Sequence, residues 1–339
     1  MKKLRILALV HEHLVPPADT SGIDVREAEW KMEYDVIETL KEMGHSLRVL
    51  GLHDDLGGIR ATVGLFKPHI VFNLMEAFAG ITTYDQNVVS YLELLQLPYT
   101  GCNPRGLILA RDKALSKKLL AYHRIAVPDF TVVRHGRRAR LSKRMRFPLI
   151  VKSLFFEASA GISQASVVEN EDQLERRVQF IHDSLGTAAI VEQFVDGREL
   201  YVGVLGNERL EVFPVWEMSF DQMPENRWRI ATERVKWSTK YQKRHGIMTD
   251  AAALPHDVAD RIQRIARRTY RALDLSGYAR IDLRMNEDGR VFVLEANPNP
   301  NLAYGEDFAE SAEVRGVSYE RLLERILALG LRWEPARTG

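Results

Sequence analysis

The sequence predicts an α/β protein with α+β parts, built from two or three domains. The chain has 339 residues, and domains usually hold roughly 150 residues. Strand-like and helix-like patterns alternate in its N-terminal part, and further along strand-like segments come in pairs joined by Asp-Gly turns. The composition, 45% hydrophobic and 27% charged, is that of an ordinary globular protein. It excludes a disordered chain, a collagen-like fibre and a coiled-coil rod.

The N-terminal part predicts a doubly wound, Rossmann-like parallel sheet. Residues 4–10 form a short apolar run typical of a buried strand, and residues 46–52 and 69–75 are two further strand-like segments. Apolar residues at helical spacing over 30–40, and a predicted helix at 84–96, complete the alternation of strands and helices that parallel sheets require. No Gly-x-Gly-x-x-Gly follows the first strand, so this part is not expected to bind NAD.

The middle of the chain predicts a smaller mixed region. A basic helix is expected over 111–124, strands around 130–133 and 149–152, and a helix up to residue 185. The dense positive run at 137–144 has no interleaved aromatic residues, which favours a solvated loop over a nucleic-acid patch. The net charge of +1 also gives no reason to expect nucleic acid or an acidic membrane surface.

The C-terminal part predicts two β-hairpins and two helices. Residues 188–195 and 198–205 flank Asp196-Gly197, a two-residue turn signal, and residues 278–297 turn at Asp288-Gly289. The helices are expected near 258–273 and 319–329.

The second hairpin brings together groups that suit a metal. If Asp288-Gly289 is a two-residue turn, Glu287 pairs with Arg290, Asp282 lies opposite Glu295 and Arg280 opposite Asn297, all four on one face. Carboxylate and amide oxygens are the ligands that Mg²⁺ prefers. A surface hairpin with cross-strand charge pairs explains the pattern as well. The residues expected on the opposite, core face are Ile281, Leu283, Phe292 and Leu294.

Two weaker signals suggest a nucleotide. Lys152 ends an apolar strand and is followed by a loop of small residues at 157–163, which could surround phosphate oxygens. The segment 192–195 could pair its backbone with adenine, and Glu199 could bind ribose hydroxyls. A flexible surface loop and a plain hairpin explain these two segments equally well.

Eight segments together carry a family resemblance. They are residues 71–76 (VFNLME), 97–101 (LPYTG), 112–117 (DKALSK), 150–152 (IVK), 191–199 (VEQFVDGRE), 235–237 (VKW), 279–282 (ARID) and 295–298 (EANP). In order and spacing they resemble the ATP-grasp superfamily and, within it, the D-alanine–D-alanine ligase-like branch. The resemblance implies an ATP-grasp fold of three lobes with ATP between the second and third. The implied lobes are an N-terminal Rossmann-like domain at 1–103, a central subdomain at 104–187 and a C-terminal subdomain with the metal site at 188–339.

The resemblance also implies residue roles. Lys236 is expected on a mobile loop that reaches the terminal phosphate, and Arg280 is expected to face the reacting carboxyl group and stabilise the tetrahedral oxyanion. Two Mg²⁺ ions, which Mn²⁺ could replace, are expected on Asp282, Glu295 and Asn297, with Glu295 bridging. The residues expected at ATP are Lys113, Lys152, Ser159, Gly161, Glu192, Gln193, Phe194, Val195 and Glu199.

The function implied is an ATP-dependent carboxylate–amine ligase that works through an acyl phosphate and releases ADP and phosphate. Departures from the family pattern predict an acceptor other than D-alanine. Residues 157–159 read Glu-Ala-Ser instead of Gly-Ser-Ser, and Glu306-Asp307 stands where the family offers a hydroxyl to the acceptor carboxylate. The candidate substrate contacts are Glu76, Asn301, Glu306 and Asp307. Two alternative functions stay open, a genuine D-alanine–D-alanine ligase and a silent ATP-binding regulator. It also stays open that Glu306 and Asp307 simply point into solvent.

The expected partners are a small-molecule carboxylate and an amine, with a homodimer possible and neither nucleic acid nor membrane involved. A cytoplasmic location is expected, because the first apolar run ends at His11-Glu12-His13 and no small-residue cleavage site follows. A single cysteine, Cys102, excludes an internal disulfide.

Overall fold

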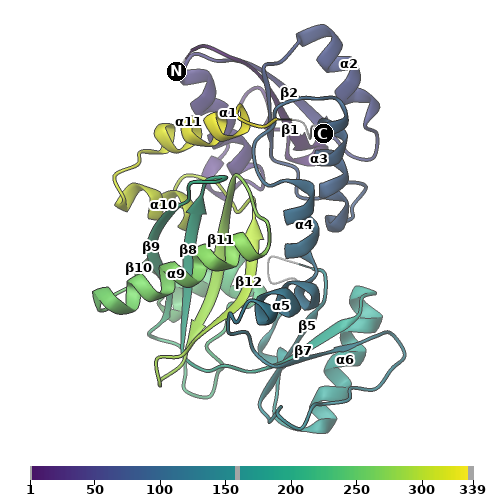
Figure 1. The fold of residues 1–339 in the computed structure, drawn as a ribbon, viewed down its shortest axis with the longest axis vertical. Helices are drawn as coiled ribbons and strands as arrows, with labels where there is room; N and C mark the ends of the chain where they lie inside the picture. The colour runs from purple at the N-terminus through teal and green to yellow at the C-terminus, as the bar shows by residue number, and fades with distance from the viewer. Residues whose placement is uncertain (1, 157–160, 335–339) are drawn as a thin grey trace.

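The computed structural model describes residues 2–156 and 161–334, and these contain three β-sheets. Figure 1 shows the N-terminal part at one end of the long axis, the five-stranded sheet in the middle and the four-stranded sheet with its helix at the other end. The predicted α/β class is confirmed. In the described part of the chain, no helix is both long and apolar enough to cross a membrane.

The N-terminal sheet is parallel and covered on both faces. Its strands run in the order β2-β1-β3. Leu7 and Leu9 pack toward α2 and α3, whereas Ile6 and Val10 pack toward α1 and the C-terminal helix α11, which returns to this sheet. The elements are β1 (Arg5–His11), α1 (Lys31–Glu42), β2 (Ser46–Leu52), α2 (Gly57–Phe66), β3 (Ile70–Asn73), α3 (Asp85–Leu94) and α11 (Tyr319–Gly330). The sequence did not predict α2, whose three glycines disfavour a helix.

The middle region holds the four-stranded sheet, ordered β4-β7-β5-β6. Asn103 caps the first helix and Asp112 the second, by accepting backbone N–H bonds, and Asn170 caps the third in the same way. The elements are α4 (Pro104–Arg111), α5 (Lys113–Tyr122), β4 (Phe130–Val133), β5 (Leu149–Ser153), β6 (Val167–Val168), α6 (Glu171–Leu185) and β7 (Ala189–Gln193).

The hairpin predicted over 188–205 is wrong. Strand β7 pairs with β4 and β5, whereas β8 (Arg198–Leu205) pairs with β9 and β11 in the other sheet. Gly197 has a φ of +136°, and a Cβ there would lie 2.1 Å from the carbonyl oxygen of Met285. The glycine therefore permits a close approach to β11 at the crossing between two sheets, and it does not form a hairpin turn. Because β7 belongs to the middle sheet, we propose that the boundary expected at 187/188 lies within 194–197.

The C-terminal region is an antiparallel sheet ordered β10-β9-β8-β11-β12, with α9 packed on one face. Its other elements are β9 (Glu211–Phe220), α7 (Glu233–Trp237), α8 (Thr239–His245), β10 (Ile247–Ala251), α9 (His256–Ala272), β11 (Tyr278–Met285), β12 (Val291–Pro298) and α10 (Asp307–Val314). Short 3₁₀ turns lie at Glu12–Leu14, Val25–Glu27, Thr82–Tyr84 and Gln164–Ser166.

The β11–β12 hairpin has the predicted pairing near its open end but not near its turn. Asp282 lies opposite Glu295 and Arg280 opposite Asn297, as expected. At the turn, however, Met285 pairs with Val291, so the loop is one residue longer than assumed and Glu287 does not pair with Arg290. An irregularity after Asp282 leaves Leu294 without a paired residue on β11 and restores the register.

This compensation changes which side chains reach the core. Ile281 and Leu283 are buried in it as predicted, but their partners there are Val291 and Val293. Phe292, predicted in the core, lies under the guanidinium of Arg290, with 4.7 Å between the Arg290 Cζ and the ring centroid. Leu294, also predicted in the core, lines a cavity on the opposite face.

Candidate active site

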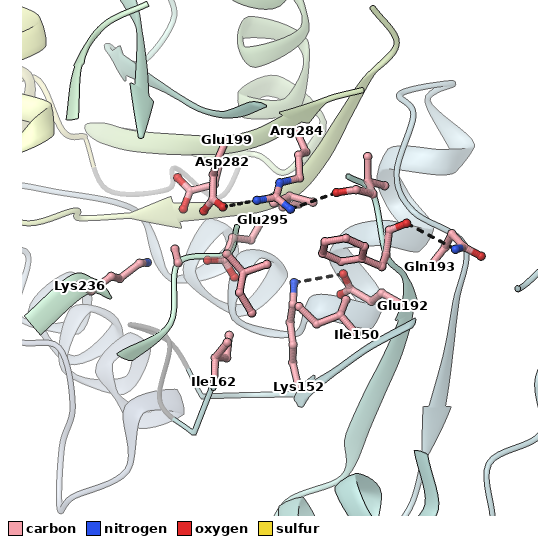
Figure 2. A pocket seen from close by; sticks show the side chains of 15 residues that line it. Ile150, Lys152, Ile162, Glu192, Gln193, Glu199, Lys236, Asp282, Arg284 and Glu295 are labelled. Carbon is pink, nitrogen blue, oxygen red and sulfur yellow. Dashed lines mark hydrogen bonds and ion pairs between the residues drawn. The ribbon is translucent and has the colours of Figure 1, made fainter. Parts of the chain in front are cut away.

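A cavity lies between the four-stranded and five-stranded sheets, and most of the predicted ATP and metal residues line it (Figure 2). Strands β5 and β7 provide one wall, and β8, β11 and β12 provide the other. The predicted residues that line it are Lys152, Glu192, Gln193, Phe194, Val195, Glu199, Lys236, Asp282 and Glu295. Lys113, Arg280 and Asn297 adjoin it, because they contact or neighbour its lining residues.

Three lysines at this cavity, two of them buried and Lys152 half-buried, share two carboxylates. Lys152 Nζ lies 3.2 Å from Glu192 Oε2, and Lys117 Nζ lies 3.4 Å from Glu192 Oε1. Lys113 Nζ lies 3.7 Å from Glu295 Oε2 and donates to the carbonyl of Phe156 at 2.8 Å. Protein atoms therefore hold all three ammonium groups in place. Lys152 lines the cavity, and Lys113 lies beside it through its contact with Glu295.

The lysines keep these carboxyl groups ionised despite burial. Burial alone would raise the pKa of Glu295, but the ammonium groups of Lys113 and Lys236 lower it to about 2. Burial also opposes ionisation of Glu192, yet Lys117 and Lys152 hold its pKa below the usual range. Burial in turn lowers the pKa of Lys113 and of Lys117. Positive charge fixed in a site of this kind is suited to phosphate oxygens.

The residues expected to bind metal are paired as the hairpin register predicted. Arg280 holds the Asp282 carboxylate with two bonds, Nε to Oδ1 at 2.8 Å and Nη2 to Oδ2 at 3.0 Å. Burial raises the pKa of Asp282, and Arg280 opposes this. The amide nitrogen Nδ2 of Asn297 is buried and has no hydrogen-bond partner in the part of the chain that the structure describes. Turning that amide over would place its oxygen there, which with the two carboxylates makes an oxygen set that fits Mg²⁺.

The far side of Arg280 carries a further carboxylate. Asp307 Oδ2 lies 3.6 Å from Arg280 Nη1. The guanidinium also stacks on Tyr201, with 4.7 Å between the Arg280 Cζ and the ring centroid. Arg280 is thus placed between one carboxylate of the metal set and one carboxylate from the start of α10.

The end of the cavity near Phe194 is apolar. Ile150, Phe194 and Ile230 line it, and Trp228 packs edge-on against Phe194 with ring centroids 5.2 Å apart. The side chain of Gln193 points away from the cavity (Figure 2) and donates to the carbonyl of Arg146 at 2.9 Å. An apolar slot of this kind suits a flat heterocycle.

Two residues at the cavity were missed by the sequence reasoning. Arg284 donates to Glu199 Oε2 at 2.8 Å and to the carbonyl of Val195 at 3.1 Å, which ties three segments of the wall together. It follows Arg280 and Asp282 at a spacing of two, so strand alternation could have found it. Lys117 follows Lys113 by four residues on α5, so helical spacing could have found it.

Several predicted residues lie elsewhere. Ser159 lies outside the described residues. The backbone N–H of Gly161 donates to Glu233 Oε2 at 3.4 Å, next to α7. Lys236 is part of the short helix α7, so the expectation that it belongs to a loop is wrong, although its ammonium points into the cavity (Figure 2).

The candidate substrate residues do not line the cavity. Asp307 contacts Arg280, whereas Glu76 and Glu306 are exposed. The side chain of Asn301 accepts the backbone N–H of Ala303 at 2.8 Å. Although solvent reaches both side chains, the protein groups packed around their carboxyl groups partly desolvate them, and this raises the pKa of Glu76 and of Glu306.

Comparisons with known proteins identify the family. Residues 119–328 match the family described as D-ala D-ala ligase C-terminus. An uncharacterised protein, y4sG, of Sinorhizobium fredii is 31% identical over 88% of this chain and 86% of its own length. A D-alanine–D-alanine ligase of Desulforudis audaxviator is 30% identical over 87% of this chain and 84% of its own. The fold is similar to that of a D-alanine–D-alanine ligase of Bacillus anthracis solved in complex with ATP, with a TM-score of 0.74 and 20% sequence identity. The match covers 97% of this chain and 98% of the other.

The chain belongs to the D-alanine–D-alanine ligase family of ATP-grasp enzymes. The predicted family and ATP-grasp fold are confirmed. The prediction of an ATP-grasp ligase that depends on ATP and Mg²⁺ is confirmed at the level of the family. The roles of individual residues and the identity of the substrates stay predictions.

Proposed function

We propose that this protein is an ATP-dependent carboxylate–amine ligase whose acceptor is an amine other than D-alanine, of cationic character, such as a basic amino acid. Family membership supports the reaction class. The acceptor is argued from one observation, the contact between Asp307 and Arg280. Both the genuine D-alanine–D-alanine ligase and the silent ATP-binding protein are outcomes of the tests below.

The reaction has two steps. A carboxylate oxygen of the first substrate attacks the γ-phosphorus of ATP, the bond to the β-phosphate oxygen breaks, and ADP leaves with that electron pair. The amine nitrogen of the second substrate then attacks the acyl carbon of the acyl phosphate. The tetrahedral species collapses to an amide and inorganic phosphate, and the nitrogen loses its proton.

The cavity residues have roles that follow from charge and position. Lys113, Lys152 and Lys236 would hold the phosphates, because their ammonium groups lie around the same buried space. Both steps place negative charge on oxygen, which fixed cations stabilise. When bound, Mg²⁺ on Asp282, Glu295 and Asn297 would neutralise phosphate charge. Arg280, beside that set, would stabilise the oxyanion of the second step.

The surroundings of Arg280 support the choice of acceptor. Its guanidinium already bonds Asp282 with two N–H groups and lies next to Asp307, so after contact with the oxyanion few of its N–H donors remain for a carboxylate of the acceptor. Asp307 would also repel a free carboxylate on the acceptor, a repulsion that the side-chain cation of a basic amino acid offsets and that D-alanine has no group to offset. Glu306 adds a second carboxyl group at the start of α10. These groups favour an acceptor with positive charge and disfavour D-alanine.

The test is a panel of amines and amino acids assayed for ADP and phosphate release, with hydroxylamine trapping of the acyl phosphate. The proposal expects turnover with basic amino acids or diamines. Turnover with D-alanine alone, at roughly micromolar to millimolar levels, would make the protein a D-alanine–D-alanine ligase. ATP binding with no turnover on any member would favour the silent regulator.

A further inference from the structure

A cluster of histidines lies in the N-terminal lobe, outside the lining of the ATP cavity. His11 ends β1, Glu12 and His13 form the 3₁₀ turn that follows, and His53 follows β2. The two strands are parallel and adjacent, with His11 opposite Leu52 at their carboxyl ends. Two segments that are far apart in sequence therefore bring the side chains of His13 and His53 close together.

The spacing of the ligand atoms fits a metal ion. Glu12 Oε1 lies 3.6 Å from His13 Nε2 and 3.5 Å from His53 Nδ1. The ligand atoms of these three residues all lie within 4.8 Å of one another. A tetrahedral ion with bonds of about 2.0–2.1 Å separates its ligands by roughly 3.4 Å. Two edges of the cluster are thus close to this value before any ion is bound.

The orientation of the rings supports the same site. His53 Nδ1 is buried and has no hydrogen-bond partner among the described residues. Its contact with Glu12 at 3.5 Å is too long for a good bond. His11 Nδ1 accepts the backbone N–H of His13 at 3.4 Å, which leaves Nε2 of His11 available. The His11 ring lies 5.3 Å from that of His13 and 5.6 Å from that of His53, between centroids.

We propose that Glu12, His13 and His53 bind a divalent transition-metal ion such as Zn²⁺, with the His11 ring packed beside the site. Imidazole nitrogens with one carboxylate select ions of this class, whereas Mg²⁺ prefers oxygen ligands alone. The ion would fasten the turn after β1 to the loop after β2. This site is separate from the Mg²⁺ site and does not depend on the proposed function.

The test is Zn²⁺ titration of the chelator-treated full chain by calorimetry, with Mg²⁺ present in excess to fill the oxygen site. One Zn²⁺ per chain is expected. Replacing Zn²⁺ by Co²⁺ gives a visible spectrum that reports the ligand geometry, and a tetrahedral spectrum is expected. Absence of stoichiometric Zn²⁺ binding would overturn the proposal.

Substitutions of the two histidines test whether they bind the ion. H13A and H53A should each lower Zn²⁺ affinity at least about 10-fold, the scale associated with disturbing metal sites. H13Q repeats the test with a side chain of similar volume. The matched control is H256A, because His256 on α9 is exposed and lies 3.2 Å from the carboxylate of Asp260, a single His–carboxylate pair. Loss of affinity in H256A, or none in H13A and H53A, would contradict the assignment. Far-UV circular dichroism checks that each variant is folded.

Discussion

The two ends of the candidate active site shift the pKa values of their carboxyl groups in opposite directions. In the cavity, Glu192 and Glu295 face lysines and have lowered pKa values. Toward the N-terminal lobe, Glu33, Glu76 and Glu306 have raised pKa values, because desolvation outweighs the attraction of the nearby cations, which are Arg111 for Glu76 and Lys31 and Arg280 for Glu306. We call this second group, together with Asp307, the acidic region.

This difference in pKa shifts suggests a division of roles: the cavity suits ATP and metal, and the acidic region suits the choice of acceptor. A lysine-rich cavity with ionised carboxylates suits ATP and Mg²⁺, the two groups on which D-alanine–D-alanine ligases depend. The acidic region would instead attract a positively charged molecule, and desolvated carboxyl groups would become more easily ionised when a cation binds beside them. The comparison predicts that changes in the cavity affect folding and ATP use, whereas changes in the acidic region affect pH dependence and the choice of acceptor.

The largest effect is expected for E192Q in the cavity. Lys117 and Lys152 would lose the carboxylate that both contact, and removal of one partner from buried pairs costs about 3–5 kcal/mol. The free energy of unfolding, measured in urea, should fall by this amount, and the KM for ATP should rise. E175Q is the control, because Glu175 forms an exposed pair with Arg138 at 3.8 Å. An E192Q variant as stable as wild type would contradict this view of the cavity.

The acidic region is expected to make stability depend on pH. The pKa of Glu33 is raised to about 7 because the side chain is buried, and one of its oxygens has no hydrogen-bond partner among the described residues. A carboxyl group with a folded pKa above its unfolded value stabilises the fold at low pH, and this stability is lost as the pH rises toward 7 and above.

The variant E33Q should remove that dependence. Between pH 5 and pH 8 wild type should lose up to about 3 kcal/mol that E33Q keeps, so E33Q should be the more stable protein at pH 8. Urea unfolding at the two pH values measures this. The exposed Glu42 on the same helix provides the control E42Q. If the free energy of unfolding changed with pH equally in wild type and E33Q, the buried Glu33 would ionise without destabilising the fold, and the prediction would be wrong.

A change at the boundary between the two regions is expected to act on the reaction rate. R280A should lower kcat by about 10²-fold or more, the scale of losing one oxyanion donor. Measured ADP release with a working amine tests this, and R280K should restore part of the rate. Near-wild-type turnover in R280A would reject the role of Arg280.

Many of the residues around the cavity could be selected from the sequence because they lie on regular strands and helices. Alternation along β11 and β12 placed Asp282 beside Glu295, and the pairing survived a longer turn only because an irregularity at Leu294 compensated for it. That compensation is a packing effect, and no local pattern marked it. Phe292 and Leu294 were therefore assigned to the wrong face.

Other features depend on contacts far apart in sequence. The Asp196-Gly197 pair carries a hairpin signal, but the approach of Met285 decides that the chain crosses between sheets there. The return of α11 to the first sheet depends on apolar surfaces at opposite ends of the chain. The acidic region likewise forms from α1, the residues after β3 and the start of α10, which only the fold brings together.

The most direct test of the division between cavity and acidic region is acceptor choice in D307N. Initial rates of ADP release are compared for wild type, D307N and E313Q, with a basic amino acid and with D-alanine. Glu313 lies exposed on the same helix, so E313Q removes an equal charge away from Arg280. We expect kcat/KM for the basic acceptor to fall about 10-fold or more in D307N alone, while use of D-alanine rises. Unchanged preference in D307N, or the same change in E313Q, would contradict the account.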